Sequence, residues 1–163
     1  MTPENEIHAQ IGQVKVGRSG QQLHALLGSC IGIGFLHHDE GIYALSHCLL
    51  SKAPELTDEI SGRYVDQAIH SMMKLLNVTP ENRRRIHVFI AGGGNMTHSP
   101  DAVDKRLVGC VNSTFAKKTL REQRLRLIHD DVGGCNARKV VIDCTTGEYS
   151  IKSIPRIGEK KHA

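Results

Sequence analysis

The chain has 163 residues, of which 39% are hydrophobic and 23% are charged. This length suits one domain, and the composition is that of an ordinary globular protein. The formal charge of +4 does not by itself indicate a nucleic-acid-binding protein, which needs a clustered basic face.

The hydrophobic pattern predicts strands interrupted by two helices. In chain order, it predicts strands at 11–16, 22–27, 31–35 and 42–50, a helix at 62–77, a strand at 86–91, a helix at about 102–122, and strands at 125–129, 139–143 and 149–154. Polar turns at 38–41 and 145–148 predict hairpins. This order of elements predicts an α+β layered sandwich with mixed β-sheets flanked by helices. We expect a single domain over residues 1–157, followed by a frayed polar tail at 158–163.

Helix boundaries and buried faces follow from the same pattern. The first helix is expected to begin after the N-cap candidate Ser61 and to end at Asn77 or near Pro80. The second helix is expected to bury Val103, Leu107, Val108, Val111, Phe115 and Leu120.

Cysteine usage and the absence of targeting patterns narrow the class further. The five cysteines form no CxxC pair, and their odd number leaves at least one unpaired, so a disulfide framework is not expected. The N-terminal segment shows no basic stretch followed by an apolar run, and no apolar stretch approaches the length of a bilayer span. These features predict a cytoplasmic protein without membrane insertion.

Cys30 is the strongest candidate for a nucleophile. It follows Gly28 and Ser29 and precedes Gly32, and these small residues permit a sharp turn and close approach of a substrate. Backbone N–H groups of Gly28, Ser29 and Cys30 at such a turn can stabilise the negative charge of a tetrahedral intermediate. The alternative is a buried structural cysteine, which is the commoner role of an unpaired thiol.

His47 is the candidate base for that thiol. It lies in an apolar strand segment, where a histidine needs a partner or a function. If the two strands pair across the 38–41 turn, His47 can face Cys30 and take its proton. The alternative is a hydrogen-bonded structural histidine.

Other polar motifs give weaker signals. Gly92, Gly93, Gly94 and Asn95 follow a predicted strand but lack the Lys-Ser/Thr of a phosphate-binding loop, so we expect a tight loop beside the active site that contacts the substrate. Arg83–Arg85 form a charge cluster that could bind acidic partners. The ten histidines show no zinc-ligand spacing, and 130–131 fits a turn better than a cation site, so no metal is expected.

Five ordered segments resemble the CheD family of chemoreceptor glutamine deamidases. In chain order they are LGSCIGI at 27–33, SHCLL at 46–50, RYVDQAI at 63–69, AGGGNM at 91–96, and DVGG at 131–134 followed by Arg138 and Gly147. These segments resemble the family's nucleophile segment, histidine segment, helix start, glycine loop and C-terminal pattern. Their order and spacing make the resemblance specific.

The resemblance also shows departures from the family pattern. It implies Cys30 and His47 as catalytic residues, and it places His24 where the family has a threonine that forms the third polar group. Leu50 or Ser51 stands where the family has a proline, and the segment 109–112 lacks the family's arginine. A divergent member with altered substrate preference, weakened catalysis or a regulatory role fits these departures.

The resemblance implies hydrolysis of glutamine side-chain amides in methyl-accepting chemotaxis receptors, with release of ammonia. It implies no cofactor, and it adds a CheC-type CheY-P phosphatase to the partners that the family implies. Two alternatives stay open: a catalytically weakened regulatory or binding module of the chemotaxis pathway, and another papain-like thiol hydrolase. The papain-like alternative predicts a long helix starting at Cys30.

Overall fold

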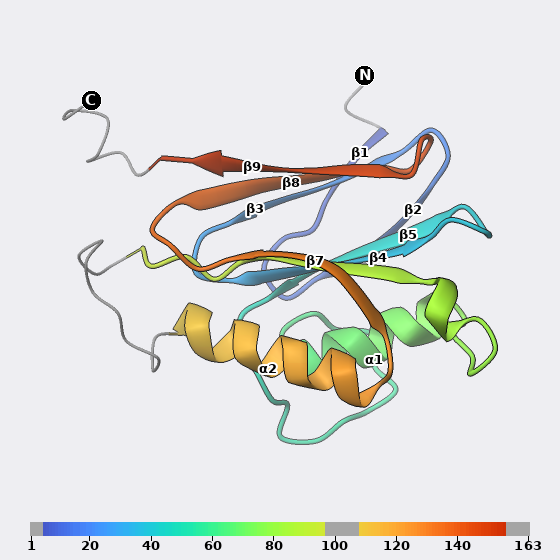
Figure 1. Ribbon diagram of the computed structural model, residues 1–163, viewed down its shortest axis with the longest axis horizontal. Helices are drawn as coiled ribbons and strands as arrows, with labels where there is room; N and C mark the ends of the chain where they lie inside the picture. The colour runs from blue at the N-terminus through green and yellow to red at the C-terminus, as the bar shows by residue number, and fades with distance from the viewer. Residues whose placement is uncertain (1–4, 97–107, 156–163) are drawn as a thin grey trace.

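Two β-sheets and one helical layer are stacked in the computed structural model, which describes residues 5–96 and 108–155 (Figure 1). The four-stranded sheet has the spatial order β1 (Glu6–His8), β3 (Gln22–Leu27), β8 (Ala137–Asp143) and β9 (Glu148–Ile154). The five-stranded sheet has the order β2 (Val14–Arg18), β5 (Ile42–Cys48), β4 (Ile31–His37), β6 (His87–Gly92) and β7 (Arg126–Val132).

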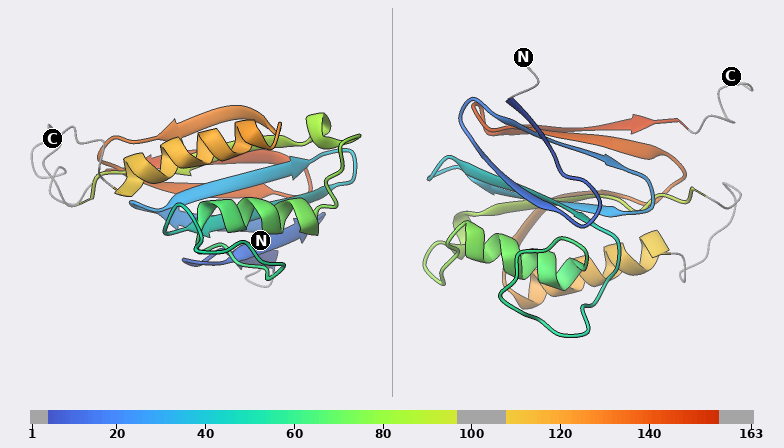
Figure 2. Two further views of the ribbon diagram at one scale, coloured as in Figure 1. Left: turned by 90° about the horizontal axis from the view of Figure 1, so that it is seen from below. Right: turned by 180° about the vertical axis from the view of Figure 1, so that it is seen from behind.

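The helices α1 (Val65–Leu75) and α2 (Val108–Glu122) cover the outer face of the five-stranded sheet, as both views of Figure 2 show. A 3₁₀ turn, η2 (Arg83–Arg85), precedes β6. β1 pairs with β3, and β6 with β7, in parallel, whereas the other strand pairs are antiparallel. The predicted α+β sandwich with mixed sheets is therefore confirmed.

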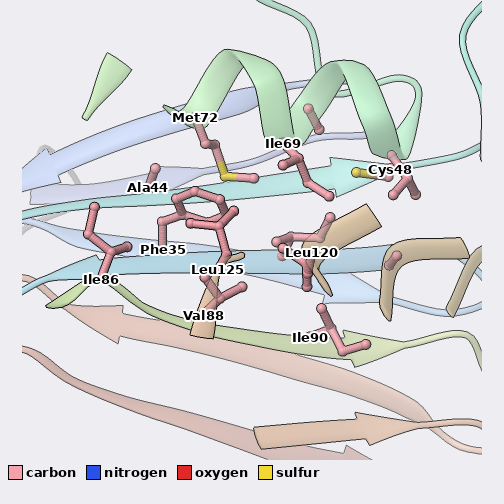
Figure 3. Packing of buried hydrophobic residues seen from close by; sticks show 14 of the residues in the cluster. Phe35, Ala44, Cys48, Ile69, Met72, Ile86, Val88, Ile90, Leu120 and Leu125 are labelled. Carbon is pink, nitrogen blue, oxygen red and sulfur yellow. The ribbon is translucent and has the colours of Figure 1, made fainter. Parts of the chain in front are cut away.

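The central strand β4 separates two hydrophobic clusters. Ile31, Ile33 and Phe35 belong to the cluster on the helical side of the sheet. Figure 3 shows Phe35 of this cluster together with Met72 and Leu120 from the helices. The alternate positions face the four-stranded sheet, as expected for a strand buried on both faces. Gly34 is one of these positions, and a Cβ there would collide with the Phe89 ring. The missing side chain lets Phe89 fill the space between the sheets.

Most helices and strands lie where the sequence pattern predicts them, but some of their boundaries differ. β1 was not predicted, because three residues are too few to show a period, and the strand predicted at 11–16 is observed as β2. The N-cap of α1 is Tyr64 rather than Ser61. The helix ends at Leu75 with Leu76 as its C-cap, and Asn77 follows with a positive φ of 51°. The first residues of the predicted second helix (102–107) and the predicted tail lie outside the described residues.

The buried face predicted for α2 is wrong in part. Val108 is 50% exposed and Val111 is 43% exposed, whereas Leu120 is buried as predicted. The helix instead buries small or polar residues, namely Gly109, Asn112, Ser113, Ala116 and Thr119. Phe115 is partly buried against the core, in line with the prediction. Small residues allow the helix axis to approach the sheet and the loop after β6 closely, so hydrophobicity alone misplaces the two valines.

Candidate functional site

Cys30 lies where the chain passes from one sheet to the other. β3 of the four-stranded sheet ends at Leu27, and β4 of the five-stranded sheet begins at Ile31. The bend at 28–30 joins them, and the Cys30 side chain packs into the cluster between the sheets with 6% of its surface exposed. The nucleophile candidate is thus held by two sheets at once and touches solvent at one edge.

His47 lies on β5 and faces the same inter-sheet space. It stands opposite Gly32 in the antiparallel pair of β4 and β5, and Cys30 precedes Gly32 by two residues. Since side chains two apart on an extended chain share a face, Cys30 and His47 lie on one side of the five-stranded sheet. Within the described residues no hydrogen bond joins the Cys30 thiol to the His47 ring. The structure therefore brings the pair to a common face without closing the contact.

The tautomer of His47 is set by a backbone group. Its Nδ1–H donates a hydrogen bond to the carbonyl oxygen of Ala9 at 2.9 Å, and only 5% of the residue is exposed. Because Nδ1 holds the proton of the neutral ring, the Nε2 lone pair is available to accept one. This is the arrangement that a general base needs, with the orienting role taken by a peptide carbonyl.

Burial shifts both titratable groups toward their neutral forms. Burial raises the pKa of the Cys30 thiol above its ordinary value, and it lowers the pKa of His47, which the hydrogen bond to Ala9 opposes in part. Near neutral pH the resting pair is therefore a thiol beside a neutral imidazole. Such a pair transfers its proton during attack on the substrate rather than before it.

The glycine loop after β6 lies directly against the Cys30 bend. The N–H of Gly93 donates to the carbonyl of Cys30, and the N–H of Gly94 donates to the carbonyl of Gly28, each at 2.9 Å. A Cβ at Gly92 would collide with the Cys30 carbonyl oxygen, and Gly92 has a φ of +105°. These contacts hold the glycine loop directly against the Cys30 bend.

An arginine supports the loop from the other sheet. Arg138 on β8 is 7% exposed, and its Nη1 donates to the carbonyl oxygens of Gly92 and Asn136, each at 3.2 Å. Its Nη2 lies 3.4 Å from a carboxylate oxygen of Asp131 at the end of β7. The ion pair keeps the buried guanidinium neutralised while it fixes the loop. Sequence reasoning recognised both residues only as part of a pattern and assigned them no role.

α2 completes the scaffold through a glycine and an asparagine. A Cβ at Gly109 would collide with the Gly93 carbonyl, so this glycine lets the helix reach the loop. The Asn112 side chain donates to the carbonyl of Leu49 at 2.9 Å and accepts from the hydroxyl of Ser51. These bonds hold the chain immediately after His47. The position between them, Val111, points to solvent.

The side chain of His24 lies away from His47. Leu23 and Ala25 face the core, so His24 points to the outer face of the four-stranded sheet. Its Nε2 hydrogen-bonds to Gln22 Oε1 at 3.0 Å, and its ring centroid is 5.0 Å from that of His8. The His24 side chain, which stands at the family's threonine position, therefore makes no hydrogen bond to His47 in the described structure.

His24 is linked to His47 through its backbone instead. The N–H of Ala9 donates to the His24 carbonyl at 2.8 Å, and the Ala9 carbonyl accepts from His47. The parallel pairing of β1 with β3 therefore positions the orienting carbonyl. No side-chain signal in the sequence could have identified Ala9, since its contribution is a peptide oxygen.

Replacing Gly92 by alanine should lower the free energy of unfolding by about 2–6 kcal/mol, because a positive φ and a collision with Cys30 add together. Gly20→Ala is the matched control: Gly20 has a φ of +92°, and its added Cβ would meet nothing within 4 Å. Urea unfolding of both variants should show a clearly larger loss for Gly92→Ala. Equal losses would mean that the collision is relieved at no cost.

Two further findings concern metal binding and membrane spans in the described part of the chain. Across 5–96 and 108–155, no three His, Cys, Asp or Glu side chains come together in a way that could hold a metal ion. In the same ranges, no helix has the length and apolar character needed to cross a membrane.

Sequence comparison identifies similar proteins across almost the whole chain. A family model described as CheD chemotactic sensory transduction matches residues 49–153. A protein of Ruegeria sp. (strain TM1040), named probable chemoreceptor glutamine deamidase CheD 2, is 44% identical over 94% of this chain and 95% of its own length. The probable chemoreceptor glutamine deamidase CheD of Bdellovibrio bacteriovorus is 32% identical over 93% of this chain and 96% of its own length.

Proposed function

Since the chain belongs to the CheD family, we propose that it is a chemoreceptor glutamine deamidase, which hydrolyses glutamine side chains of chemotaxis receptors to glutamate. The names of its relatives support the reaction and the substrate class. The observation that carries the mechanism is the placement of Cys30 and of a His47 ring with a fixed tautomer on one face of the sheet. We assign Cys30 as nucleophile and His47 as base.

The proposed reaction has two stages, formation of a thioester with Cys30 and its hydrolysis. His47 Nε2 takes the thiol proton while sulfur bonds to the carboxamide carbon, and the N–H groups of Ser29 and Cys30 stabilise the oxyanion. His47 then gives the proton to the nitrogen, the C–N bond breaks, and ammonia leaves a thioester. His47 next removes a proton from water, whose oxygen attacks the thioester, and the thiol is released with that proton. The product is glutamate.

The shape of the site favours a slender substrate. Cys30 is 6% exposed and is enclosed by the bend, the glycine loop and the other sheet. A glutamine side chain can extend its carboxamide to such a thiol, whereas a peptide bond brings bulky chain on both sides. Cys30 also precedes a strand rather than a helix, unlike the arrangement expected for a papain-like hydrolase. Both features support side-chain deamidation over peptide hydrolysis.

Mass spectrometry of receptor cytoplasmic domains incubated with the protein tests the proposal. Each conversion of glutamine to glutamate adds about 1 Da and releases one ammonia, and we expect both in equal amounts. Absence of conversion by the folded protein would favour the alternative of a regulatory or binding module, which the departure at His24 motivates. Binding of a CheC-type phosphatase belongs to the same proposal and is testable by co-purification.

The pH dependence of kcat/KM should reflect the protonation states of Cys30 and His47 in the free protein. Burial lowers the pKa of His47 and raises that of Cys30, so kcat/KM should stay level over a broad range around neutral pH. It should fall at lower pH because protonated His47 cannot accept the thiol proton, and at higher pH because the pair has lost the proton that the leaving ammonia needs. Rates of ammonia release from about pH 5 to about pH 10 check this profile. Activity that rises already at acid pH and declines just above neutral pH would instead indicate a preformed thiolate–imidazolium pair.

A further inference from the structure

One groove in the described part of the molecule lies away from Cys30. It has a volume of about 900 Å³ and lies where α2 ends and β7 begins. Its lining combines three leucines (Leu120, Leu125 and Leu127) with five basic residues (Arg84, Lys117, Arg121, Arg124 and Arg126). We call it the basic groove. None of its residues takes part in the proposed chemistry.

The cations of the basic groove are largely uncompensated. Lys117 pairs with Asp130 at 3.1 Å, but within the described residues Arg84, Arg121, Arg124 and Arg126 have no carboxylate partner. All four arginines are exposed. Four arginines that share one concave surface create a positive potential much stronger than the net charge of +4 suggests. The ligand that complements this surface carries several negative charges.

The leucines of the groove indicate which kind of negatively charged ligand fits it. Leu120 and Leu125 are buried below the basic rim, and Leu127 is partly buried. An apolar floor under a cationic rim complements an amphipathic helix that has an apolar stripe flanked by carboxylates. A phosphate backbone would contact the arginines and leave the leucines unused. The lining therefore favours an acidic protein helix over a nucleic acid.

The basic groove and the candidate active site lie at opposite ends of the same elements. β6 runs from His87, next to η2, to Gly92, whose loop holds the Cys30 bend, and its six residues span about 20 Å. α2 runs in the reverse sense, from Gly109 at the loop to Arg121 at the basic groove. A helix of about 14 residues spans the same length.

The solvent face of α2 connects the two ends. Val111, Thr114, Lys118 and Arg121 follow one another at three- and four-residue steps, and all are exposed. The stripe is apolar beside the glycine loop and basic beside the groove. A helix lying along α2 would therefore meet apolar surface near Cys30 and positive charge at its far end.

We propose that the basic groove is a docking surface for an acidic amphipathic helix of the receptor substrate, at a distance of about 20 Å from the glutamine that reacts at Cys30. This inference rests on the proposed function, because it assigns the partner of the groove as the deamidase's own substrate. The groove contributes to the affinity for the substrate helix and sets the position of that helix along α2, and it touches no reacting atom. It gives a role to Arg84, the member of the charge cluster at 83–85 that lines the groove.

Charge reversal tests the proposal by kinetics. Arg121→Glu/Arg124→Glu should raise the KM for a receptor cytoplasmic fragment at least about tenfold and flatten its dependence on NaCl. The ratio of kcat/KM for the fragment to that for a capped six-residue glutamine peptide should fall by a similar factor. Arg18→Glu/Lys152→Glu makes the same charge change at exposed positions outside the groove and should not alter this ratio. An unaltered ratio in the groove variant would overturn the proposal.

Direct binding tests it without turnover. A fluorescent 18-residue helical peptide with an apolar stripe and a glutamate face should bind the Cys30→Ala protein and lose affinity when the groove charges are reversed. The same peptide with glutamines in place of the glutamates should bind weakly. Tighter binding of a short DNA duplex or of anionic vesicles than of the acidic peptide would overturn the assignment to a protein helix. Arg121→Gln/Arg124→Gln, checked by circular dichroism, replaces the reversal variant if that variant fails to fold.

The two failures are distinguishable. Absence of deamidation by the folded wild-type protein refutes the proposed function, whereas peptide binding still reports on the groove. Deamidation that is insensitive to the groove variants refutes the docking surface and leaves the proposed function standing.

Discussion

Cys30→Ala should reduce the conversion of glutamine to glutamate by at least about a thousandfold, because removal of a nucleophile eliminates the covalent route altogether. The fold should survive, since the substitution removes one sulfur from a side chain at the edge of the inter-sheet cluster. The measurement is mass spectrometry of receptor fragments after timed incubation with equal amounts of wild-type and variant protein.

Cys144→Ala is the matched control for this variant. Cys144 is buried in the same cluster, and burial raises the pKa of its thiol to about 11. The chemical change and the lost packing are alike, but Cys144 has no place in the proposed reaction. Conversion that survives in Cys30→Ala, or that is lost equally in both variants, would remove Cys30 as the nucleophile.

His47→Gln should lower kcat by about 10²–10⁴-fold while leaving binding of the receptor fragment close to normal, because proton transfer is the contribution that disappears. Glutamine can still donate a hydrogen bond from its side-chain amide toward the Ala9 carbonyl, so the variant removes the base with little loss of packing. The measurement is kcat and KM from initial rates of ammonia release. In the variant, the fall in activity at acid pH that we assign to His47 should also disappear.

His37→Gln provides the corresponding control. His37 is 3% exposed on β4, and its Nδ1 has no hydrogen-bond partner in the described structure. Its replacement alters a buried imidazole without touching the proposed machinery, so any kinetic effect should be small. Near-normal kcat in His47→Gln would assign the base to another group.

The strands that carry the site could be predicted because their patterns are strong. Ile42–Cys48 and Ile31–His37 are fully buried, and the turn between them has polar residues and a glycine with a φ of +61°. Their pairing follows from that turn, and it brings Cys30 and His47 to one face as the hypothesis required. The glycine loop was placed correctly for a similar reason, since three successive glycines directly after a strand permit close backbone approach.

Features that depend on tertiary contact could not be predicted. The exposed valines of α2 look buried by periodicity, and only the collision at Gly109 shows why a glycine face packs inward. The direction of His24 depends on which face of β3 meets the other sheet, which the sequence alone does not determine. The basic groove combines η2, α2 and β7, so its charges are close only after folding.

The carbonyl of Ala9 has a consequence for how this site responds to mutation. Because the group that orients His47 is a peptide oxygen, no side-chain substitution deletes it, and an alanine scan would report a catalytic dyad. Position 24 can therefore exchange threonine for histidine without loss of the acceptor, as long as the ladder between β1 and β3 persists. An amide-to-ester replacement between residues 9 and 10, made by chemical ligation, weakens that oxygen as an acceptor. Such a backbone edit would expose a third participant that conventional mutagenesis cannot detect.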